Sequence, residues 1–154
     1  MNLILETSES VPFHTDMRST LKALGVDASA YDWFVSDVET NVAVPTHHLN
    51  DVWVSGEELS QLLMGDIQFI WAVFSAVPRG TRFSVPVPPC ADGNSTFWQP
   101  PEVRPQLDGA CFEIVCWDSS ATILVGLSMD HAQRFLATYP EAKALSSTWS
   151  RLDV

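Results

Sequence analysis

Residues 111–127, CFEIVCWDSSATILVGL, contain two apolar runs separated by a short polar stretch. The runs, Cys111 to Trp117 and Thr122 to Leu127, are rich in β-branched and aromatic residues, which favour strands. The residues between them, Asp-Ser-Ser-Ala, are typical of a turn. This stretch therefore predicts a β-hairpin, and with it an antiparallel sheet.

Three segments upstream extend this sheet. Residues 31–39, YDWFVSDVE, alternate with a period of two around aromatic residues, which indicates a strand. Phe34 and Val38 fall on the face opposite Trp33, so we expect both faces of this strand to be partly covered. Residues 67–78 carry no charge and predict a central strand buried on both faces. The short apolar run over residues 52–54 favours a further strand.

Helices are predicted where a capping residue precedes an apolar helical face. They begin after Thr15 or Asp16, after Ser55 with Glu58 completing a capping box, and after Ser128. Residues 141–149 predict one more short helix. The order of these elements predicts an α+β fold, in which residues 1–154 form a single domain with a mostly antiparallel sheet and about three short helices.

Residues 79–109 have a different composition from the rest of the chain. Seven of the ten prolines fall within residues 78–109, so little regular structure is expected there. Phe97 and Trp98 lie near the middle of this Pro-rich segment. They indicate an irregular segment that is anchored to the domain, not a free linker.

The chain is strongly acidic, and the acidity is uneven. The formal net charge is −11, from 19 Asp and Glu against 8 Lys and Arg. Residues 1–66 hold eleven of the acids but only Arg18 and Lys22 as bases, a net charge of −9. Such a charge repels phosphate backbones and disfavours direct nucleic-acid binding. A hydrophobic content of 46% excludes a disordered acidic tail.

The N-terminal residues lack the basic region and apolar core of a secretory signal. The longest uncharged stretch is shorter than the roughly 20 residues of a membrane-spanning helix. Three cysteines, Cys90, Cys111 and Cys116, are an odd number without CxxC spacing. We therefore expect a cytoplasmic protein with free thiols, of which only Cys90 is accessible.

Two groups of residues are candidates for catalysis or metal binding. His47 and His48 lie close to Asp51, and imidazoles beside a carboxylate can act as metal ligands or as an acid–base pair. In a regular strand, Asp37 and Glu39 would share one face about 7 Å apart, a spacing that suits a catalytic carboxylate pair. No nucleotide-binding or zinc motif accompanies them, so we expect no cofactor and no metal. A small metal-dependent or hydrolytic enzyme using these residues is an alternative.

Six tryptophans are more than a core of this size ordinarily needs. Tryptophan is enriched in binding hot spots, and an acidic rim would steer a basic partner towards them. The sequence therefore predicts a partner-binding surface from the tryptophans and the neighbouring carboxylates. Its residues are Asp32, Trp33, Asp37, Glu39, Trp53, Glu57, Glu58 and Trp98.

Three motifs, Trp33-Phe-Val-Ser-x-x-Glu39, Ser55-Gly-x-Glu-Leu59 and Ala76-Val-Pro78, occur in this order. Through these motifs, the first half of the chain resembles an uncharacterised family of small bacterial proteins without known catalytic residues. The Pro-rich segment is a feature by which this chain differs from that family. In composition the whole chain resembles the small acidic immunity proteins of bacteria, which neutralise cognate toxins. This resemblance implies a non-catalytic protein that binds a basic toxin. A phage-type inhibitor that mimics nucleic acid is a further alternative, and would require carboxylates spaced regularly along one face.

Overall fold

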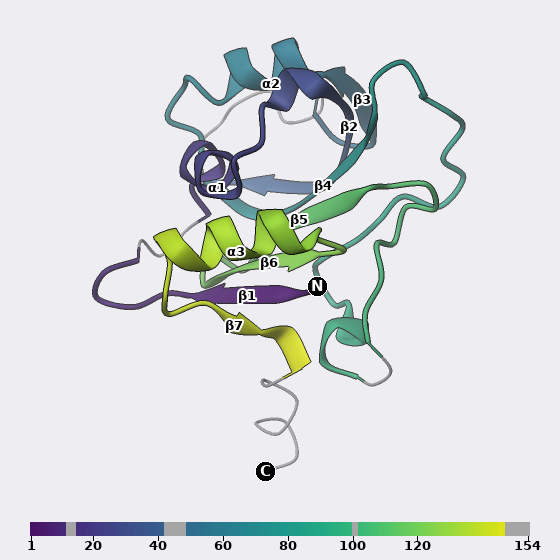
Figure 1. Cartoon of the computed structure of the whole chain (residues 1–154). Coiled ribbons are helices and arrows are strands. Elements are labelled where there is room, and N and C mark those ends of the chain that lie inside the picture. Colours follow the sequence, from purple (N-terminus) through teal and green to yellow (C-terminus); the bar gives the residue numbers. More distant parts are fainter. Residues whose placement is uncertain (12–14, 42–48, 100–101, 147–154) are drawn as a thin grey trace.

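The computed structural model describes residues 1–11, 15–41, 49–99 and 102–146 (Figure 1). They form three α-helices and a seven-stranded sheet of order β3-β2-β4-β5-β6-β1-β7. The helices are α1 (Met17–Leu24), α2 (Gly56–Leu62) and α3 (Met129–Thr138). The strands are β1 (Leu3–Glu6), β2 (Tyr31–Thr40), β3 (Val52–Ser55), β4 (Phe69–Pro78), β5 (Phe112–Trp117), β6 (Ala121–Val125) and β7 (Lys143–Ala144). All the paired strands are antiparallel, so the predicted α+β fold is confirmed.

The predicted hairpin is formed by β5 and β6. Trp117 pairs with Ala121 at its closed end. Asp118 and Ser119 in the connection have φ values of 48° and 54°, in the left-handed region. Asp is among the residues that tolerate this region best, and the two conformations together reverse the chain.

The three helices begin where the capping residues Asp16, Ser55 and Ser128 predicted. Asp16 precedes α1 and accepts a hydrogen bond from the backbone N–H of Ser19. Gly25 follows α1 in a left-handed conformation, with φ at 72°. Ser55 and Glu58 form both hydrogen bonds of a capping box at the start of α2. None of the helices among the described residues is long and apolar enough to cross a membrane.

The chain termini differ from the prediction. A helix was expected over residues 141–149, but within the described part of it Lys143 and Ala144 form β7, which pairs with Leu3 and Ile4, and only Leu145 and Ser146 are helical, in a 3-10 turn. Residues 147–149 lie outside the described part of the chain. The strand β1 was not predicted at all. Such short segments become strands because a neighbouring strand offers unpaired backbone groups, which no local pattern reveals.

The three helices cover one face of the sheet, with α3 over β5 and β6 (Figure 1). This helical face buries the larger hydrophobic cluster. Its fully buried side chains include Leu24, Trp33, Leu59, Phe74, Ile114 and Phe135.

The opposite face is covered by the Pro-rich segment, residues 79–109, which we call the strap. Apart from a 3-10 turn, η3 (Ser95–Trp98), its described residues contain no helix or strand. The side chains of Ala91, Phe97 and Leu107 are nevertheless buried against the sheet. Both faces of the central strands are therefore covered, as the interrupted alternation of β2 predicted.

Candidate partner-binding surface

Two of the predicted surface carboxylates already have cationic partners within the chain. Asp32 in β2 is buried, and its carboxylate accepts a hydrogen bond from Gly80 N (2.9 Å) and pairs with Arg82 at 3.4 Å. Burial alone would raise the pKa of Asp32, but these hydrogen bonds and the charges of Arg82 and Arg79 outweigh it, so the pKa lies below its usual value. Glu57 pairs with Arg79 at 2.9 Å. Both arginines lie in the strap, so the acidity of this region is partly neutralised by the second half of the chain.

Asp37 serves as an anchor for the strap. The register between β2 and β4 shifts between Ser36 and Glu39, and Asp37 has a φ of 52° within this bulge. Its carboxylate accepts hydrogen bonds from the backbone N–H groups of Ala91 (2.7 Å) and Asp92 (2.8 Å). The uninterrupted strand that would have made Asp37 and Glu39 a regular carboxylate pair is therefore not formed.

Glu113 in β5 was not predicted as a functional residue, yet it holds the other end of the strap. Its buried carboxylate accepts hydrogen bonds from the Ser75 hydroxyl (2.6 Å) and from the backbone N–H groups of Gln106 (2.6 Å) and Leu107 (3.1 Å). Burial raises the pKa of Glu113, although these hydrogen bonds act in the opposite direction. A glutamate inside the apolar run of β5 was the sequence signal for this role.

Two of the predicted tryptophans have different degrees of exposure. The side chain of Trp33 is fully buried, and its indole N–H donates to the carbonyl of Ala28 at 3.0 Å. This burial corrects the prediction for Trp33, because its side chain offers no surface to a partner. Trp53 is half-buried at the β3 edge, packs against Phe34 and Phe83, and donates to the carbonyl of Phe83 at 3.1 Å.

Trp98 belongs to a group of three half-buried tryptophans, which we call the tryptophan cluster. Trp117 lies at its centre, with ring centroids 4.8 Å from Trp71 and 5.2 Å from Trp98. All three rest on the strap face, where Phe97 is fully buried beside Trp117. Of the three, the sequence predicted only Trp98, because Trp71 and Trp117 lie in the longer apolar runs, residues 67–78 and 111–117, without an acidic residue directly before them.

Glu39 lies beside this cluster. It pairs directly with Trp71 in the sheet, and directly opposed residues project from the same face. Trp71 in turn contacts Trp117 on the next strand, so the three residues form one row across the sheet. Glu39 is exposed. The structure thus brings two predicted residues, Glu39 and Trp98, to opposite ends of one surface.

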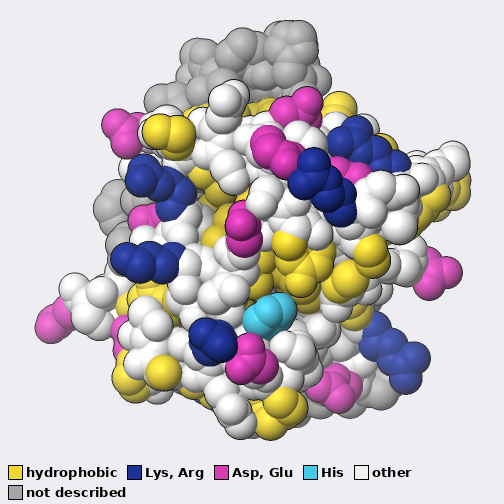
Figure 2. Space-filling view, turned by 45° about the horizontal axis from the view of Figure 1, so that its top comes forward, with side chains coloured by type: hydrophobic (Ala, Val, Ile, Leu, Met, Phe, Trp, Pro, Cys, Tyr) yellow, Lys and Arg dark blue, Asp and Glu magenta, His cyan; other side chains and the backbone are white. Residues whose placement is uncertain are grey.

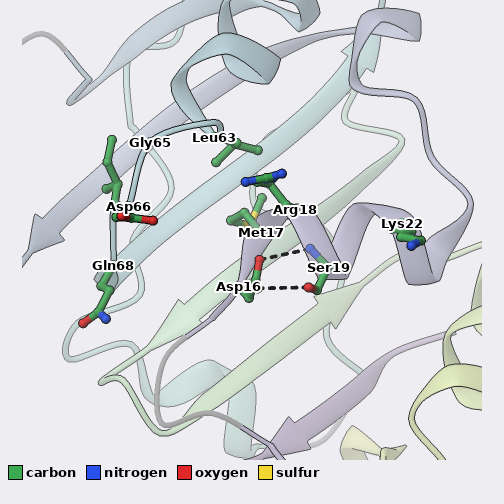
Figure 3. Close-up of a pocket in the computed structure, with 10 residues that line it drawn as sticks. Asp16, Met17, Arg18, Ser19, Lys22, Leu63, Gly65, Asp66 and Gln68 are labelled. Carbon is green, nitrogen blue, oxygen red and sulfur yellow. Dashed lines mark hydrogen bonds between the residues drawn. The ribbon is translucent and has the colours of Figure 1, made fainter.

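The helical face has a different feature, a hollow of about 750 Å³ between α1 and the segment that joins α2 to β4 (Figure 3). Arg18 and Lys22 line it together with Asp16 and Asp66. Both carboxylate oxygens of Asp16 are used by Ser19, at 3.0 and 2.9 Å. The opposite charges balance, so the hollow favours neither a cation nor an anion.

The candidates for catalysis or metal binding find little geometric support. His47 and His48 lie outside the described residues. Within the described ranges, no group of three or more His, Cys, Asp or Glu could hold a metal ion. Among the thiols, Cys116 is buried, but Cys90 and Cys111 are both exposed. The prediction that only Cys90 is accessible was wrong, since Cys111 precedes β5 and is not enclosed by it.

The chain was compared with known proteins in three ways. No protein-family model matches it, and neither a curated protein nor a solved structure shows significant similarity to it. Its function is therefore inferred from its own residues.

Proposed function

We propose that this protein is a non-catalytic immunity protein or inhibitor that neutralises a cognate bacterial toxin, in the cytoplasm, by binding a basic surface of that toxin. The observation that carries the proposal is the tryptophan cluster with Glu39 at its edge. Half-buried aromatic side chains beside a carboxylate combine the two properties of a hot spot for a basic partner, apolar area and complementary charge.

The packing of the cluster supports its use as a binding surface. Trp117 contacts both other tryptophans edge to face, with interplanar angles of 71° and 88°. These contacts restrict the side chains before a partner arrives. A pre-ordered aromatic surface loses little conformational entropy on binding, which favours affinity.

The charge of the chain supports a basic partner. Among the described residues only four ion pairs form, through Arg79, Arg82, Arg134 and Lys143. With 19 acids and 8 bases, a formal net charge of −11 would remain even if every base were paired. A surplus of this kind accelerates association with a cationic protein, and the acceleration weakens as salt rises.

The alternatives gain less support. The carboxylate of Asp37 is used to hold the strap, which removes it from a catalytic pair with Glu39. A mimic of nucleic acid requires a continuous line of carboxylates. On the face in Figure 2, Asp and Glu are interspersed with Lys and Arg and form no such line.

The experiment that tests the proposal uses the product of the neighbouring gene, since immunity genes lie beside toxin genes. We expect the two purified proteins to form a complex in calorimetry at 50 mM salt. In stopped-flow mixing, the association rate should fall several-fold at 300 mM salt. Co-expression should also protect cells from the neighbouring product. The absence of a complex at both salt concentrations would contradict the proposal.

A further inference from the structure

The five carboxylates predicted for the partner surface differ in whether their charge is used within the chain. Four of them have partners: Asp32 with Arg82, Glu57 with Arg79, Asp37 with the N–H groups of Ala91 and Asp92, and Glu58 with the N–H of Ser55. The carboxylate of Glu39 makes no hydrogen bond or ion pair with any described residue. Glu39 is thus the member of this set that retains an unused negative charge.

The aromatic neighbours of Glu39 also have unused surface. Glu39 and Trp71 are paired across β2 and β4, between two shifts of register, so the two residues are cross-strand neighbours. Trp71 meets Trp117 edge to face, an arrangement that covers at most one face of each ring. Trp71 is half-buried, so part of its indole is open to solvent.

We infer that Glu39 and Trp71, supported by Trp117, form a receptor for one arginine side chain of the protein partner. The inference rests on the proposed function and specifies the contact. A guanidinium is planar, so it can stack on an indole while two of its N–H groups donate to one carboxylate. A lysine ammonium cannot make both contacts in this way, because it is a compact point charge.

The receptor can be tested on the isolated protein with short peptides. The probe is acetyl-Gly-Arg-Gly-amide, and the matched peptides carry citrulline or lysine in place of arginine. We expect the arginine peptide to bind in the millimolar range, about the strength of a single contact of this kind, and to shift the indole N–H signals of Trp71 and Trp117 in NMR spectra. The signal of buried Trp33 should not move. Citrulline, which has nearly the same shape without the charge, should give no shift.

Substitutions then assign the contact to Glu39. We expect Glu39→Gln to reduce the arginine-induced shifts about tenfold at equal peptide concentration, since the neutral amide loses the charge-assisted hydrogen bonds. Asp66→Asn is the matched control, because Asp66 is also exposed but lines the hollow on the helical face. It should leave the shifts unchanged. An unaltered Trp33 signal shows that each variant keeps its fold.

The outcomes separate this inference from the proposed function. Equal shifts with the arginine and citrulline peptides, or shifts that survive Glu39→Gln, would overturn the arginine receptor. In the toxin complex, Glu39→Gln and Trp71→Phe should each weaken binding about tenfold. A complex that is insensitive to both variants would refute the receptor but leave the immunity function standing. If the arginine peptide binds but the neighbouring gene product forms no complex, the immunity function would be refuted and the arginine receptor would stand.

Discussion

The two faces of the sheet are covered by different physical means. On the helical face, α1, α2 and α3 satisfy their own backbone groups, and the contact with the sheet is made by apolar side chains. The strap has almost no regular structure, so its backbone N–H groups need other acceptors. The strands supply them as carboxylates, from Asp32, Asp37 and Glu113. A Pro-rich segment can therefore close a hydrophobic face when charged groups in the sheet hold its backbone.

The largest test of this difference compares two fully buried aromatic residues, Trp33 on the helical face and Phe97 in the strap. Replacing either by alanine should lower the free energy of unfolding by about 3–5 kcal/mol. We expect Trp33→Ala at the upper end, because the larger side chain leaves the larger cavity and the carbonyl of Ala28 loses one of its two donors. Phe97→Ala should lie at the lower end, since an irregular segment can settle into the space. Urea unfolding followed by circular dichroism measures both. An equal or larger loss for Phe97→Ala would mean that the strap is as rigid as the helical layer.

A second test compares two glycines that lie against a neighbour. A Cβ at Gly56 would lie 1.9 Å from the carbonyl oxygen of Ala28, so α2 would have to move. We expect Gly56→Ala to cost about 3 kcal/mol. At Gly126 a Cβ would lie 2.8 Å from Pro105 of the strap, and φ is 78°. Gly126→Ala should cost less, about 1–2 kcal/mol, because the strap can shift and the backbone strain is moderate. Thermal unfolding of both variants measures the two losses of stability. A larger loss for Gly126→Ala than for Gly56→Ala would contradict the prediction.

A third test removes one anchor of the strap. Asp37→Gly deletes the acceptor for Ala91 and Asp92 without straining the backbone, whose φ is positive at Asp37. We expect a loss of about 1–2 kcal/mol, from two N–H groups left without their acceptor. Hydrogen exchange at these two amides should accelerate, while exchange in α1 should change little. Uniform acceleration across the chain would show that the strap does not open independently.

The smallest effect concerns pH. The pKa of Glu113 is raised in the folded protein, so the folded state binds the proton more tightly than the unfolded state. Protonated Glu113 therefore contributes its full stabilisation at pH values below its pKa in the unfolded protein. This contribution is lost as the pH rises through its pKa in the folded protein. We expect the stability of the native protein relative to Glu113→Gln to fall as pH rises, by about 1.4 kcal/mol for each unit of pKa elevation. Urea unfolding between pH 4 and pH 8 measures the difference, and a constant difference would contradict it.

Part of the candidate surface was predictable from the sequence. Glu39 and Trp98 were selected from the sequence because acidic and aromatic residues outside a uniform apolar pattern are visible locally, and the structure places both on the strap face. Trp71 and Trp117 were missed, since they resemble ordinary strand residues. Trp33 was included wrongly, because its burial depends on residues far along the chain, such as Phe112 in β5, against which its ring packs.

By itself the sequence determined the hairpin, the helix caps at Asp16 and Ser55, and the acidity that favours a basic partner. These depend on interactions between residues a few positions apart, and on composition. Only the tertiary structure decided which carboxylates remain free. Asp37 meets Ala91 across 54 positions of the chain, and Asp32 meets Gly80 across 48. Such contacts form when the strap folds back onto the strands, so the availability of Glu39 follows from the packing of the whole domain.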